Sequence, residues 1–176
     1  ACAKPTIEKI VNSILNKVGN KIEKEFGEYL VSYSAQLALE SKLNHVRIPL
    51  SELFKEKISG NPGFDFHTVS PNTLVVFGEA KYNSNKTPYD DAEGQINDFL
   101  KPTPEYQKHL KELKEIRRFV GDVAAQNVID GRIGVAAAFS IHAKGVSLVM
   151  ENAIKYPEFK NLLSNEEIYV IGVHII

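Results

Sequence analysis

The segment from Thr73 to Tyr82 constrains the fold more than any other part of the chain. It reads TLVVFGEAKY, and alternate residues of a strand point to opposite faces of a sheet. Both faces begin with apolar side chains, so we predict a central strand in a sheet covered on both sides. Two charged residues, Glu79 and Lys81, then follow on one face at the end of the strand. A buried charge is costly unless it is paired or binds a metal ion, so this end requires further polar groups.

The rest of the chain is predicted to supply the sheet and its cover. The order of elements is α, β, β, α, α, β, α, β, which predicts an α/β fold with a central mixed sheet flanked by helices. The predicted helix at 20–41 is apolar nearly all round, which indicates a helix covered on more than one side. The other predicted helices are one before Gly19 and those at 89–100, 104–129 and 147–163, and the strands are 64–69, 73–82, 131–142 and 167–176.

Composition limits the classes of protein. A chain of 176 residues is expected to form one domain, 1–176, either alone or as one domain of a longer protein. The net charge of −1 excludes a strongly basic surface, so any nucleic-acid contact must be local. The single cysteine, Cys2, excludes an internal disulfide. The longest apolar-rich stretch, 133–141, is about half of the ~20 residues that a membrane-spanning helix needs. We therefore expect a cytoplasmic protein without a membrane span.

A predicted hairpin brings an acidic residue to the charged end of the central strand. The turn at 70–72 places Asp65 close to the level of Glu79, adjacent or diagonal to it. Two adjacent carboxylates repel each other, and a hard cation such as Mg²⁺ relieves this repulsion. A lysine beside them can orient or deprotonate water, or stabilise negative charge in the transition state. Asp65 and Glu79 are thus predicted metal ligands, with the carbonyl of Ala80 as a third, and Lys81 is the predicted catalytic amine.

The tripeptide Glu-x-Lys carries little information alone, because it occurs four times in this chain, at 40–42, 79–81, 112–114 and 158–160. Three of these fall in predicted helices, where surface Glu and Lys are common. Only the one at 79–81 ends a buried strand with an aspartate on the neighbouring strand. The alternative interpretation is a structural cluster of ion pairs at the end of the sheet.

The segments Gly63-Phe64-Asp65-Phe66 and Val75 to Tyr82 resemble the PD-(D/E)xK, or restriction-endonuclease-like, nuclease superfamily. The proline that names the motif is absent before Asp65. The resemblance implies a restriction-endonuclease-like core and a nuclease that uses Mg²⁺ or Mn²⁺ to hydrolyse phosphodiester bonds, above all in DNA. A looser likeness to nuclease domains of bacterial anti-phage defence systems implies a role in antiviral defence.

The same resemblance implies two further site residues on helices. Gln95, fourteen residues after Lys81, looks like the glutamine motif of the RecB-like branches, which lies near the active site. The helix at 20–41 resembles one that often adds an acidic ligand, and Glu28 is preferred over Glu25 and Glu40. An exposed helix glutamine and a solvated glutamate are the respective alternatives.

Other classes stay open at the level of sequence. The chain could be a catalytically inactive nucleic-acid-binding or assembly domain with the same fold, or a hydrolase of small phosphoesters with a closed pocket. A zinc site formed by His67, His142 and His174 is a weaker alternative. Because the overall charge is near zero, we expect that a homodimer or a partner subunit helps to hold the nucleic acid.

Overall fold

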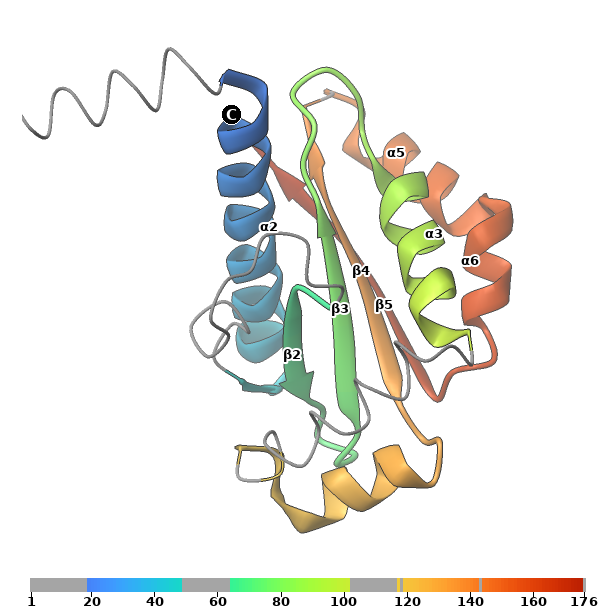
Figure 1. Cartoon of the computed structure of the whole chain (residues 1–176). Coiled ribbons are helices and arrows are strands. Elements are labelled where there is room, and N and C mark those ends of the chain that lie inside the picture. The colour runs from blue at the N-terminus through green and yellow to red at the C-terminus, as the bar shows by residue number, and fades with distance from the viewer. Residues whose placement is uncertain (1–18, 49–63, 102–116, 118, 143, 176) are drawn as a thin grey trace, which may run out of the picture.

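One mixed sheet with helices on both faces forms the body of the molecule (Figure 1). The computed structural model describes residues 19–48, 64–101, 117, 119–142 and 144–175. Its strands are β1 (Val46–Arg47), β2 (Phe66–Val69), β3 (Val75–Lys81), β4 (Gly134–Ile141) and β5 (Glu167–His174). Its helices are α2 (Gly19–Leu43), α3 (Tyr89–Leu100), α5 (Val146–Lys155) and α6 (Pro157–Leu162), and residues 119–129 are also helical.

The strands lie in the order β1-β2-β3-β4-β5. β1, β2 and β3 pair antiparallel, whereas β3, β4 and β5 pair parallel. Parallel neighbours need crossover connections, and these hold α3 and 119–129 between β3 and β4, and α5 and α6 between β4 and β5. β3 is central, and its residues 75–80 are buried. The predicted α/β fold with a mixed, helix-flanked sheet is confirmed, and the restriction-endonuclease-like core stays a prediction.

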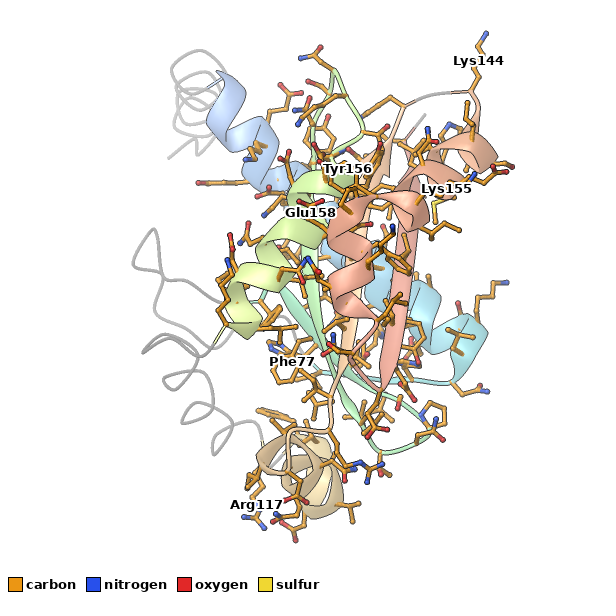
Figure 2. All side chains as sticks on the ribbon, turned by 90° about the vertical axis from the view of Figure 1, so that its right-hand side faces the viewer. Phe77, Arg117, Lys144, Lys155, Tyr156 and Glu158 are labelled. Atoms are coloured by element: carbon orange, nitrogen blue, oxygen red, sulfur yellow. The ribbon has the colours of Figure 1, made fainter. Side chains whose placement is uncertain are left out.

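The two faces of the sheet are covered by different helices. Val31 and other apolar residues of α2 pack on one face, against Phe66 and Val76. Helix α3 and residues 119–129 pack on the other face, where Phe77 lies (Figure 2). On the α2 face the ring of Phe66 lies over Gly78, so close that a Cβ there would be 2.3 Å from ring atoms. Only glycine fits opposite Phe66 without moving the ring.

Helix α2 differs from the prediction in one respect. It was expected to be covered on more than one side, but only one side packs on the sheet, where Val31, Ala35 and Leu39 are buried. On the opposite side Phe26 is 65% exposed and Leu37 is 44% exposed. Among the described residues the prediction is therefore wrong, because helical periodicity shows which side chains are apolar, but not whether another element lies against them.

Other differences concern boundaries. The helix expected at 147–163 is two helices, since Pro157 begins α6 and the residue before a proline avoids helical geometry. Tyr156 accordingly has φ −66° and ψ 144°. β1 was not predicted, and with two residues it is too short to show alternation. The helix predicted before Gly19 and residues 104–116 lie outside the described residues. No helix in the described part of the chain is long and apolar enough to cross a membrane.

Candidate active site

Asp65 and Glu79 face each other across the β2–β3 hairpin. The last pair of the register is Phe66 with Gly78, and one further step places Asp65 opposite Glu79. Oδ2 of Asp65 accepts a hydrogen bond of 2.8 Å from the backbone N–H of Ala80. The side chain thus satisfies a donor of β3 at the point where β2 has ended. The carboxyl groups of Asp65 and Glu79 lie close enough for Asp65 to raise the pKa of Glu79.

Lys81 lies between this pair and α2. Its Nζ donates to Oε1 of Glu79 at 2.5 Å and lies 3.8 Å from Oε1 of Glu28. The side chain of Glu79 is fully buried and that of Lys81 is 13% exposed. Lys24, one helical turn before Glu28, lies 3.8 Å from the same Glu28 oxygen. The structure therefore brings together Asp65, Glu79, Lys81 and Glu28. Of the three helix glutamates considered, Glu28 is the one that pairs with Lys81.

Burial and neighbouring charges set the protonation of this cluster. Burial and the charge of Asp65 raise the pKa of Glu79 well above its usual value, although Lys81 opposes the shift. Burial also raises the pKa of Glu28, against the influence of Lys81. For Lys81, burial lowers the pKa, but the charges of Glu79 and Asp65 outweigh burial and the net shift is upward. Lys81 is therefore a cation, suited to stabilise negative charge rather than to take a proton from water.

The oxygen atoms at this end of β3 fit a hard cation. Oε2 of Glu79 and Oε1 of Glu28 are buried without a hydrogen-bond partner among the described residues. In a strand the N–H and C=O of one residue point to the same neighbour, so the carbonyl of Ala80 points past the end of β2, as its N–H does. Mg²⁺ prefers oxygen ligands and keeps several water molecules, so it needs only one or two carboxylates. Asp65, Glu79 and the Ala80 carbonyl meet that requirement.

The described residues do not form a larger preformed metal site. Within them, no group of three or more His, Cys, Asp or Glu side chains is arranged to hold a metal ion. Glu28 lies 3.8 Å from Lys81, and the charge of Asp65 contributes to the raised pKa of Glu28. The three-histidine zinc site is likewise not formed: Phe77 packs edge-on against His67 at 5.2 Å between ring centroids, and Tyr82 against His142 at 5.7 Å.

A pocket of about 740 Å³ opens beside Lys81. Gln95 from α3 lines it together with Lys81, whereas Asp65, Glu79 and Glu28 do not. Lys81 is thus the residue common to the carboxyl cluster and the pocket. Gln95 lies in the vicinity that its resemblance implied. The remaining lining residues are Lys24, Tyr82, Asn83, Pro88, Asp90, Asp91, Gly94, Asp98 and Phe99.

Sequence reasoning missed several of these neighbours. Lys24 could have been found, because it precedes Glu28 by four residues and so shares its side of the helix. Tyr82 packs over Gly27, where a Cβ would be 2.2 Å from the ring. Because glycine permits this contact, α2 approaches the end of β3 closely enough for Glu28 to reach Lys81. The three aspartates of α3 that line the pocket, Asp90, Asp91 and Asp98, gave no recognisable signal in the sequence.

Known proteins offer no further guide to this site. The candidate residues come from four separate segments of the chain, and only the 65 and 79–81 segments form a recognisable motif. The likeness to the PD-(D/E)xK superfamily stays a prediction. Comparison with models of protein families, with curated proteins and with solved structures finds no match for this chain.

Proposed function

We propose that the chain is a metal-dependent nuclease that hydrolyses phosphodiester bonds in DNA. The observation that supports this most is the contact between the carboxyl groups of Asp65 and Glu79, with the amine of Lys81 2.5 Å from Glu79. Two carboxyl groups held together with one fully buried destabilise a fold unless a cation or proton is bound between them. Clustered groups with shifted pKa values beside a pocket are typical of catalytic sites.

Asp65, Glu79 and the carbonyl of Ala80 would hold Mg²⁺ or Mn²⁺, with Glu28 as the nearest further carboxylate. When bound, such a cation lowers the pKa of water and stabilises negative charge on a phosphate oxygen. Lys81 contributes a fixed positive charge at the mouth of the pocket, where the charge of the transition state develops. The amide of Gln95, which lines the same pocket from α3, can orient a phosphate oxygen or water by hydrogen bonding.

Cleavage of linear and circular double-stranded DNA in the presence of Mg²⁺ or Mn²⁺ tests the proposal. We expect cleavage by the wild type, and a loss of about 100-fold or more for Lys81→Ala and Glu79→Gln. Lys155→Ala is the matched control, since Lys155 also pairs with a glutamate, Glu151, but on an exposed surface. Its activity should equal that of the wild type. Circular dichroism shows whether each variant is folded.

Removal of the metal gives an independent check. EDTA should abolish cleavage, and added Mg²⁺ should restore it in the wild type but not in Glu79→Gln. Cleavage of circular DNA would identify an endonuclease. A folded wild-type protein that cleaves neither substrate with either metal would overturn the proposal and favour the inactive binding or assembly domain.

A further inference from the structure

Helix α2 carries a second apolar stripe on the side that faces away from the sheet. Phe26, Leu30, Tyr33 and Leu37 recur at spacings of four, three and four residues. Each is exposed, from 42% for Leu30 to 65% for Phe26. Alternating spacings of three and four place side chains in one line along a helix, which is the pattern that helices use to pack along other helices.

The stripe is large enough to form an interface. Tyr29 and Leu43, 38% and 46% exposed, lie beside it and extend the apolar surface. Since a fully buried aromatic side chain covers about 150–250 Å², these half-exposed aromatic and leucine side chains present roughly 500 Å². The largest apolar patch on a typical monomer is about 300–600 Å² and is often functional. Two such stripes together bury roughly 1,000 Å², the lower limit for a specific interface.

We propose that this stripe is the interface of a homodimer, in which α2 packs antiparallel along α2 of a second copy. A two-fold axis lets one stripe face its own copy, so no second complementary surface is required. In the antiparallel arrangement Leu30 lies level with Tyr33 of the second copy, and Phe26 with Leu37 of the second copy. Each layer then combines one aromatic ring with one leucine, so large and smaller side chains alternate along the seam.

One edge of the stripe is already ordered in the single chain. Arg47 of β1 forms an ion pair with Glu40, with its Nε 2.8 Å from the carboxylate, and its guanidinium lies over the ring of Tyr33, 5.8 Å from the centroid. Side chains that are held in place before association lose less conformational entropy on binding. The stripe therefore offers a partly fixed surface rather than a set of free side chains.

Sedimentation or light scattering of the full chain over a range of concentrations tests the dimer. We expect a concentration-dependent dimer for the wild type, and at least about tenfold weaker association for Leu30→Glu and Leu37→Glu. The matched control is Leu148→Glu, because Leu148 of α5 is 62% exposed and lies away from the stripe. It should associate like the wild type. These measurements need no nuclease activity, so their outcome is separate from the proposed function.

A wild type that stays monomeric at every concentration, or a dimer that Leu30→Glu and Leu37→Glu leave intact, would overturn the proposal. A monomer that unfolds in Leu30→Glu would also overturn it, because the stripe would then be covered by another part of the same chain.

Discussion

At the scale of the residue, Asp65 combines a structural contact with a chemical one. Its side chain accepts a hydrogen bond from the backbone N–H of Ala80, just past the end of β2. Its carboxyl group also lies close to that of Glu79. The first contact needs only an acceptor, whereas the second places two acidic groups together at a cost. Substitutions at this one position can therefore separate the two contributions.

We expect Asp65→Asn to raise the free energy of unfolding by about 1 kcal/mol in metal-free buffer, because the amide keeps an acceptor for Ala80 and adds a donor towards Glu79. Asp65→Ala should lower it by about 1–3 kcal/mol, because a buried donor loses its acceptor. Both variants should lose cleavage. Urea denaturation measures the difference. Equal destabilisation by the two variants would show instead that the carboxylate serves a structural ion pair with Lys81.

At the scale of the element, an acidic contact lies where α6 meets α3 (Figure 2). Glu93 of α3 is completely buried, and neither of its carboxylate oxygens has a hydrogen-bond partner among the described residues. Burial, with smaller contributions from Glu158 of α6 and Asp90 of α3, raises the pKa of Glu93 to about 8. The folded protein thus holds this group uncharged at neutral pH.

This contact makes stability depend on pH. Between the ordinary pKa of 4.5 and the folded value of about 8, the unfolded chain releases the Glu93 proton while the folded chain keeps it. The free energy of unfolding therefore falls as pH rises through this window, by about 1.4 kcal/mol for each pH unit at most. Glu93→Gln removes the ionisable group, so its stability relative to wild type should increase from pH 5 to pH 8 and then level off.

Chemical denaturation at pH 5, 7 and 9 measures this effect. Glu151→Gln is the control, since Glu151 on α5 is exposed, and its difference from wild type should stay nearly constant over the same range. A constant difference for Glu93→Gln as well would show that the unfolded and folded chains bind the Glu93 proton equally.

At the scale of the whole molecule, a polar network joins segments that are far apart in the sequence. Nδ1 of His45 lies 2.9 Å from the hydroxyl of Thr68, and Nε2 lies 3.1 Å from the hydroxyl of Tyr169. Tyr169 donates to Glu167 at 2.8 Å, so Nε2 of His45 is the donor to Tyr169 and Nδ1 accepts from Thr68. Burial lowers the pKa of His45, in keeping with this neutral form. The network ties the end of α2 to β2 and β5.

We expect Tyr169→Phe to lower the free energy of unfolding by about 1–2 kcal/mol, because it leaves the buried His45 without an acceptor and removes a donor to Glu167. Tyr29→Phe, on the exposed side of α2, should change it by less than about 0.5 kcal/mol. Thermal or urea denaturation compares the two. Equal effects would mean that water replaces the Tyr169 hydroxyl at no cost.

The local pattern of the sequence determined the elements and the core of the carboxyl cluster. Alternation in 73–82 predicted a strand buried on both faces, and the turn at 70–72 was sufficient to bring Asp65 to Glu79, because hairpin register depends on neighbouring residues alone. Helical spacing predicted α2 and α3 in the same way. The implied positions of Glu28 and Gln95 near Lys81 agree with the geometry, while their roles stay predictions.

Only the tertiary structure decided what lies against each element. The aspartates of α3 that line the pocket lie near Lys81 because the crossover after β3 lays α3 beside that strand's end, and Lys24 joins them from α2. Within the part of the chain that the structure describes, the burial of Glu93 without a hydrogen-bond partner and the exposed side of α2 have the same origin. Periodicity assigns a side chain to one side of a helix, but burial, pKa and exposure depend on contacts between segments distant in the sequence, and no local pattern encodes these.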